Sequence, residues 1–102
     1  MSDHRLYTQD VEAILPDAAW DEAYFSLLSL KHLLQGIPGW ESMNVFATNL
    51  GANKLRLTVS TYWDTPINLE TWLLSPVTVE AVLKSLDPPP EELQVRFYEK
   101  IQ

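Results

Sequence analysis

The chain contains no cysteine, so disulfide bridges, thiolate metal sites and cysteine nucleophiles are all excluded. Basic residues are few and scattered: seven Lys and Arg stand against fourteen Asp and Glu, giving a net charge of -7. Nucleic-acid backbones and anionic membranes attract clustered positive charge, so neither is an expected partner. No apolar run is long enough to span a bilayer, and the first five residues lack the apolar segment of a signal peptide. We therefore expect a cytoplasmic protein.

Histidine is also scarce. The two histidines, His4 and His32, do not form a pair at metal-ligand spacing, so no metal site is expected. No serine lies in the glycine-rich context of a nucleophile elbow. The 102 residues are enough for one domain, which we expect to occupy residues 1–102. Four Trp, four Tyr and three Phe give this short chain a large apolar surface, which suits a subunit contact or a ligand pocket in addition to the core.

Hydrophobic periodicity predicts the order strand, helix, strand, strand, broken helix, strand. The expected strands are residues 6–15, 41–48, 54–63 and 93–101, and the expected helical segments are residues 18–35, 67–74 and 77–86. The clearest alternation runs through residues 54–63. On the first helix an apolar stripe recurs at helical spacing, formed by Trp20, Ala23, Tyr24, Leu27, Leu30 and Leu34.

Capping residues mark where the predicted helices begin and end. Asp17 is placed to cap the first helix, and Gly36 stands at its C′ position. Thr65-Pro66 has the pattern of an N-cap followed by proline in the first turn, and Ser75-Pro76 repeats that pattern. The second helical region is therefore expected to be broken in two.

This order predicts an α+β fold of ferredoxin-like β-α-β-β-α-β type, with a four-stranded antiparallel sheet covered by helices on one face. The opposite face would carry Tyr62, Tyr98, Ser60 and Thr58, a mixture too apolar for water and too polar for a dry core. Pairing with an identical copy is the simplest way to cover such a face, so we expect a homodimer.

Three segments in register resemble the dimeric α+β barrel superfamily, and within it the antibiotic-biosynthesis-monooxygenase-like (ABM-like) domains. They are residues 37–40 (Ile-Pro-Gly-Trp), 59–65 (Val-Ser-Thr-Tyr-Trp-Asp-Thr) and 70–76 (Glu-Thr-Trp-Leu-Leu-Ser-Pro). The resemblance covers nearly the whole chain. It implies that two four-stranded sheets pair into a barrel, with a pocket in each subunit between its own sheet and helices.

The resemblance also implies which positions would carry an oxygenase site. The family pattern pairs the Trp of the third strand, here Trp63, with an Asn four residues earlier and a Tyr six residues later. Those two positions hold Val59 and Leu69, so the polar half of the site is missing. Any enzymatic activity would be that of a cofactor-independent monooxygenase, which needs a dry pocket and a polar group to hold a substrate anion.

Haem-degrading members of the superfamily carry a Trp ten residues before an axial His, and an Asn in the first strand. Trp72 matches the Trp, but the position of the His holds Val82, which cannot ligate iron, and Asp10 stands near the place of the Asn. Haem degradation is therefore not expected, and no cofactor is implied. Asp10 and Glu12 share one strand face. They form either a buried carboxylate pair, or ordinary carboxylates that lie at a solvated strand end or form ion pairs with Arg56 or Arg96.

We therefore predict a small-molecule-binding or cofactor-free monooxygenase-like protein, with a mainly apolar pocket for a small apolar or aromatic ligand. The alternative is a non-catalytic structural or regulatory homodimer whose pocket is filled by Trp63 and Trp72. An open cavity above roughly 300 Å³ would favour the ligand, and a filled one the alternative. The candidate binding residues are Trp63, Trp72, Asn44, Tyr24 and Tyr62.

Overall fold

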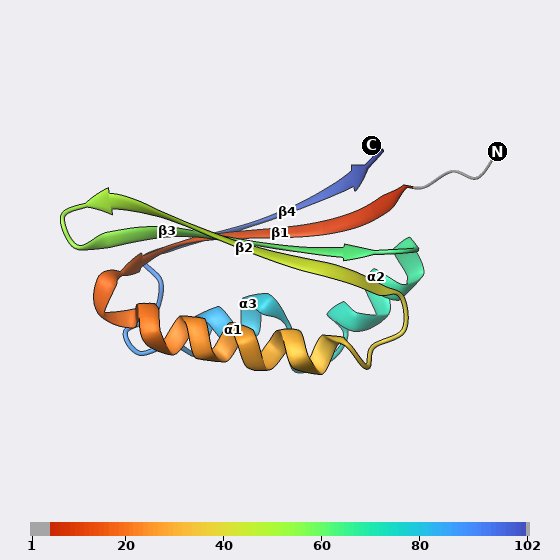
Figure 1. The fold of residues 1–102 in the computed structure, drawn as a ribbon, viewed down its shortest axis with the longest axis horizontal. Helices are drawn as coiled ribbons and strands as arrows, with labels where there is room; N and C mark the ends of the chain where they lie inside the picture. The colour runs from red at the N-terminus through yellow and green to blue at the C-terminus, as the bar shows by residue number, and fades with distance from the viewer. Residues whose placement is uncertain (1–4, 102) are drawn as a thin grey trace.

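Four antiparallel strands form one sheet, and the helices cover one of its faces (Figure 1). The structure, a computed structural model, describes residues 5–101. In chain order the elements are β1 (Leu6–Pro16), a 3-10 helix (Asp17–Ala19), α1 (Trp20–Leu34), β2 (Trp40–Gly51), β3 (Lys54–Trp63), α2 (Pro66–Leu73), α3 (Val79–Lys84) and β4 (Glu92–Lys100). The predicted α+β, ferredoxin-like β-α-β-β-α-β fold, with its second helix in two pieces, is confirmed.

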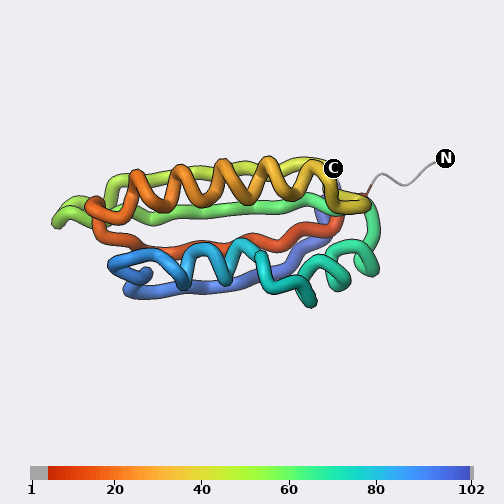
Figure 2. The backbone as a smooth tube through the Cα atoms, turned by 90° about the horizontal axis from the view of Figure 1, so that it is seen from below, coloured from red at the N-terminus to blue at the C-terminus, as the bar shows by residue number. Residues whose placement is uncertain are grey.

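The sheet order is β2-β3-β1-β4, so β1 and β3 are central and β2 and β4 are edge strands. Every pairing is antiparallel, and Val11 of β1 stands opposite Val59 of β3 and Val95 of β4. Figure 2 shows α1 running along the β2–β3 half of the sheet, while α2 and α3 run along the β1–β4 half. The edge strand β2 therefore lies on the α1 side of the helical layer, and the edge strand β4 lies on the side of α2 and α3.

The core lies between the sheet and the helices. Alternate residues of the central strands face the helices, as the period-two pattern predicts, and α1 contributes Ala23, Leu27, Leu30 and Leu34. Two members of the predicted stripe lie at the margin of the core instead: Tyr24 is 46% exposed and Trp20 is half-buried. The fully buried large side chains are Trp63, Leu15, Leu34, Leu57, Leu83, Val11, Val59, Val79 and Thr61.

Two of the predicted helix starts are wrong. Asp17 does not cap α1; it lies in the 3-10 helix, where its backbone N–H donates to the Asn53 carbonyl of the β2–β3 turn at 2.8 Å. Ser75 closes a local turn onto Val77, and Thr78 caps α3 by accepting from the Ala81 N–H. Asp17 therefore bonds to the β2–β3 turn and Ser75 bonds to Val77, and neither caps the helix that the sequence predicts it to cap.

The cap at Thr65 is confirmed. Its side chain accepts a hydrogen bond from the Asn68 N–H at 3.1 Å, and Pro66 occupies the first turn of α2. Gly36 follows the C-cap residue of α1 at the C′ position, also as predicted. Within residues 5–101, the structure has no helix with the length and apolar character needed to cross a bilayer.

The face of the sheet away from the helices, here called the open face, is polar at its centre. Thr8 and Ser60 are buried on it, and the Ser60 hydroxyl donates to Asp10 at 2.6 Å. Glu12 lies between two guanidinium groups, 3.2 Å from Arg56 and 3.8 Å from Arg96. Of the two alternatives for these strand carboxylates, Glu12 therefore follows the ion-pair one.

Candidate functional site

Trp63 and Trp72 stack on each other beneath α2. Their ring centroids are 5.0 Å apart with an interplanar angle of 25°, and their side chains are 0% and 3% exposed. Trp63 Nε1 donates to the Thr61 hydroxyl, and Trp72 Nε1 donates to the Val77 carbonyl, both at 3.1 Å. Since both indole donors are bonded within the chain, neither is free to orient a ligand. The space between the sheet and α2 is filled at this point.

Gln9 lies on the same helix-covered face and was not among the candidates. It stands opposite Thr61 on β3 and Phe97 on β4, and its side chain is only 2% exposed. Its Oε1 atom is buried without a hydrogen-bond partner among residues 5–101. Burying an unpaired amide oxygen costs about 1–3 kcal/mol. The signal in the sequence was this polar residue at an inward position of an otherwise apolar strand face.

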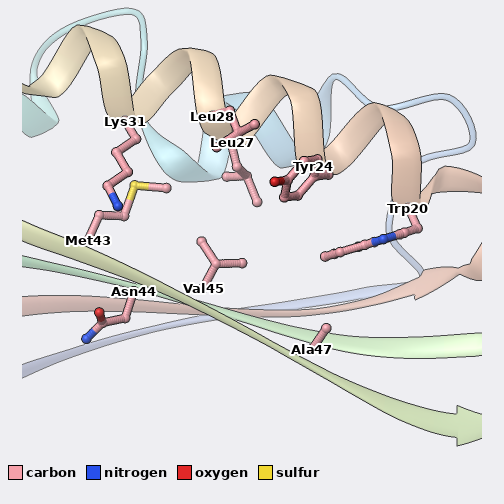
Figure 3. Close-up of a pocket in the computed structure, with 9 residues that line it drawn as sticks. All are labelled: Trp20, Tyr24, Leu27, Leu28, Lys31, Met43, Asn44, Val45 and Ala47. Atoms are coloured by element: carbon pink, nitrogen blue, oxygen red, sulfur yellow. The ribbon is translucent and has the colours of Figure 1, made fainter.

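A pocket opens between α1 and the edge strand β2, with a volume of about 530 Å³ (Figure 3). Helical spacing aligns one set of lining residues on α1, and alternation aligns another set on the same face of β2. The α1 set is Trp20, Tyr24, Leu27, Leu28 and Lys31; the β2 set includes Met43, Val45 and Ala47. The walls are therefore mainly apolar. One wall is formed by α1 and the other by β2.

Charge enters this α1–β2 pocket through Lys31. Figure 3 shows its side chain descending from α1 toward Met43, at the end of the pocket away from Trp20. Tyr24 contributes a phenol whose ring lies 5.8 Å from that of Trp20. One end of the pocket is thus aromatic and the other carries an ammonium group. Such a site fits a flat apolar molecule with a negative group at one end.

The five candidate residues do not converge on one site. Tyr24 and Asn44 both border the α1–β2 pocket, but the Asn44 side chain points away from α1 in Figure 3, as its pairing with Ser60 requires. Tyr62 lies on the open face, opposite Thr8, with Lys100 Nζ 5.4 Å from its ring centroid.

Metal-ligating groups do not gather in the part of the chain that the structure describes. Across residues 5–101, no three His, Asp or Glu side chains lie close enough together to hold a metal ion. His32 is exposed on α1, and His4 lies outside the described residues.

Neither a protein-family model nor a curated protein matches the sequence. Solved structures do match. A variant of SnoaB, a cofactor-independent oxygenase from Streptomyces nogalater, superposes with a TM-score of 0.71 at 10% identity, covering 97% of this chain and 95% of that one. A candidate antibiotic-biosynthesis monooxygenase from Nitrosomonas europaea gives 0.71 at 10% identity, covering 99% and 94%.

A haem-degrading protein from Mycobacterium tuberculosis, in a haem-free form, gives a TM-score of 0.65 at 16% identity, covering 95% of this chain and 93% of that one. At such identities a structural likeness establishes a fold, and activity has to be argued from the site. The oxygenase and the haem degrader share one architecture despite their different chemistry. The chain therefore has the fold that these oxygenase-named and haem-degrading proteins share.

Proposed function

We propose that the chain is a monooxygenase-like small-molecule-binding protein whose ligand is a flat, apolar molecule with an anionic group. The α1–β2 pocket carries this proposal. Its volume of about 530 Å³ exceeds what a small aromatic molecule needs, and its lining is apolar except for polar tips such as Lys31 and Tyr24. The aromatic body would lie against Trp20 and Tyr24, with the anion toward the Lys31 ammonium.

The chemistry that suits such a pocket needs no cofactor. An electron-rich enolate or phenolate can give an electron to dioxygen and then combine with it at carbon to form a peroxide. Loss of water from that peroxide leaves one oxygen atom on the carbon as a ketone. The contribution of the protein is to bind the apolar body of the substrate and to stabilise the anion with the Lys31 ammonium.

Binding of naphthoate, compared with its neutral amide, tests the charge preference. We expect naphthoate to bind more tightly than naphthamide, and Lys31→Gln to weaken naphthoate by about two- to tenfold while leaving naphthamide unchanged. Lys84→Gln removes the same charge from α3, where Lys84 pairs with Glu80, and is the matched control. Equal binding of acid and amide, or an equal effect of both lysine variants, would contradict the proposed orientation.

Oxygen consumption tests the reaction itself. Anthrone forms an electron-rich enolate, and its oxidation to anthraquinone consumes one dioxygen and releases one water. We expect the protein to accelerate this conversion and Ala47→Trp, which places an indole in the pocket, to remove the acceleration. Binding of naphthoate without any acceleration of anthrone oxidation would leave a binding protein and exclude the oxygenase.

The Trp63–Trp72 stack favours a second function, that of a non-catalytic structural or regulatory homodimer. The two stacked indoles fill the part of the space under α2 where they lie and leave no room for a substrate at that point. Ala47→Trp separates the two functions. A structural protein would still fold and associate when the indole fills the α1–β2 pocket, whereas an oxygenase would lose its acceleration of anthrone oxidation. A failure to bind either naphthalene probe would favour this alternative.

In both cases we infer that the chain works as a homodimer joined through the open face. Thr8 and Ser60 are buried at the centre of this face, whereas Phe46 and Tyr98 at its margins are 59% and 49% exposed. Such a surface is costly to leave in water, and a second copy offers complementary groups through two-fold symmetry.

A further inference from the structure

A second pocket lies on the other half of the sheet, between α2 and the β1–β4 strand pair. Its volume is about 440 Å³, and its apolar walls include Leu69 and Leu73 from α2, Tyr7 from β1 and Phe97 from β4. The Phe97 ring is 57% exposed although it projects from the helix-covered face, because α2 does not reach over the whole of the edge strand. This α2–β4 pocket shares no lining residue with the α1–β2 pocket.

Its charged groups have the opposite sign to Lys31. Glu70 and Glu99 both line the α2–β4 pocket, and no Lys, Arg or His among residues 5–101 does so. Glu99 is 3.5 Å from Arg5, a half-exposed ion pair of modest strength. Glu70 has no ion-pair partner within residues 5–101. An apolar pocket edged by carboxylates favours a ligand that carries positive charge.

Gln9 lies beside this pocket on the helix-covered face but does not line it. Two of its neighbours on the helix-covered face, Tyr7 on β1 and Phe97 directly opposite on β4, line the α2–β4 pocket. Its buried Oε1 atom lacks a donor among residues 5–101, so the floor next to the pocket holds an unused acceptor. Since Gln9 does not line the pocket, the charge preference of the site comes from Glu70, Glu99 and the Phe97 ring.

We propose that the α2–β4 pocket binds a hydrophobic amine, meaning a primary ammonium group on an aryl or alkyl body. The body would lie between Leu73 and the Phe97 ring, whose face attracts a cation, and the ammonium would lie toward Glu70. This site is separate from the α1–β2 pocket, so amine binding here does not depend on the proposed oxygenase function.

Three probes of nearly equal shape test the charge preference: phenethylamine, phenethyl alcohol and hydrocinnamate, which are cationic, neutral and anionic near neutral pH. We expect weak binding of the amine, with a dissociation constant of about 1 mM, and weaker binding of the other two. Amide chemical-shift changes on the full chain should fall on α2, β1 and β4. Tighter binding of the alcohol or the acid than of the amine would overturn the proposal. So would an absence of amine binding at a concentration about tenfold above the expected dissociation constant.

Variants then assign the groups. Glu70→Gln and Phe97→Leu should each weaken the amine by about two- to fivefold, the range expected of half-exposed charge and cation–π contacts. Asp21→Asn, the same change of charge on the exposed first turn of α1, should have no effect. Neither Glu70→Gln nor Phe97→Leu should change naphthoate binding, which keeps this site distinct from the α1–β2 pocket. Unaltered amine binding in both variants would refute the assignment.

Gln9→Met separates ligand binding from folding. Replacing the unpaired buried amide by an apolar side chain of similar length should raise the thermal unfolding midpoint by roughly 2–8 °C. It should leave amine binding unchanged, because Gln9 does not line the α2–β4 pocket. Weaker amine binding by the more stable variant would show that the ligand reaches Gln9 and would overturn the proposed binding pose.

Discussion

At Gly39 the backbone adopts φ = +83°, in the left-handed region that residues with a side chain rarely enter. A Cβ atom here would collide with the Asn68 side chain and the Asp64 carboxylate, which hydrogen-bond to each other at 2.8 Å. The Asp64 N–H in turn donates to the Gly39 carbonyl at 2.9 Å. Two of the family-like segments, residues 37–40 and 59–65, therefore meet at this glycine and fix the entry into α2.

Gly39→Ala should lower the free energy of unfolding by about 1–3 kcal/mol, from the left-handed backbone and the collision together. Gly36→Ala is the matched control three residues earlier. Gly36 does not have a positive φ, and a Cβ added there would meet the Leu33 carbonyl oxygen at 3.7 Å, an ordinary contact. Urea unfolding of both variants gives the comparison. Equal losses of unfolding free energy in the two variants would show that the close approach of Gly39 to Asn68 and Asp64 adds no cost of its own.

Residue identity alone could not reveal the orphaned oxygen of Gln9. The sequence shows a polar residue at an inward position, but such a residue is usually bonded to a neighbour. Only the three-dimensional arrangement, which places Gln9 between Thr61 and Phe97, shows that its Oε1 atom accepts no hydrogen bond from residues 5–101. The same holds for Asn44, since the strand pairing decides which way its amide points.

At the scale of single elements, the strands were predicted better than the helix ends. The alternation in β3 reflects burial of one face against the helices, so residues 54–63 were predicted to the residue. β2 runs three residues longer than expected at its far end, to Gly51, because hairpin pairing with β3 continues it through exposed positions. Tertiary pairing of this kind leaves no hydrophobic pattern in the sequence.

The pockets were harder to predict than the elements. An apolar stripe such as that of α1 has the same pattern whether its margin packs against the sheet or borders a cavity. Trp20 and Tyr24 border the α1–β2 pocket, whereas Leu30 and Leu34 fill the core. The difference depends on how far α1 stands from the edge strand, which periodicity does not encode.

The start of α2 depends on one side chain. Thr65→Ala removes the acceptor of the Asn68 N–H and should cost about 1 kcal/mol of unfolding free energy. Thr65→Ser keeps a hydroxyl in the same place and should recover most of that loss. Thermal unfolding of the three proteins tests this. If Ser and Ala behave alike, the methyl group of Thr65, rather than its hydroxyl, stabilises the helix start.

At the scale of the whole molecule, charge is distributed unevenly between the two faces of the sheet. The chain carries a net charge of -7, yet four of its seven basic residues, Lys54, Arg56, Arg96 and Lys100, lie on the open face by register. There they offset Asp10, Glu12 and Glu92, so this face is less negative than the remainder of the surface. Two copies that each carry -7 would meet most easily through their least negative faces.

The proposed dimer predicts a different outcome for the same substitution on the two sides of the molecule. Phe46 stands opposite Thr58 on the open face and is 59% exposed, while Phe25 is 67% exposed on the outer surface of α1. Burial of a phenylalanine ring in an interface contributes about 1.5–3 kcal/mol, so Phe46→Glu should weaken association at least about tenfold.

Phe25→Glu removes an equally large ring and adds the same charge, but it should leave association unchanged because α1 lies on the other side of the sheet. Sedimentation velocity over a range of protein concentrations measures both variants against the parent chain. A parent chain that sediments as a monomer at micromolar concentration would exclude the dimer. Equal weakening by the two variants would move the interface from the open face to the helical layer or make it nonspecific, and the buried Thr8 and Ser60 would then require another explanation.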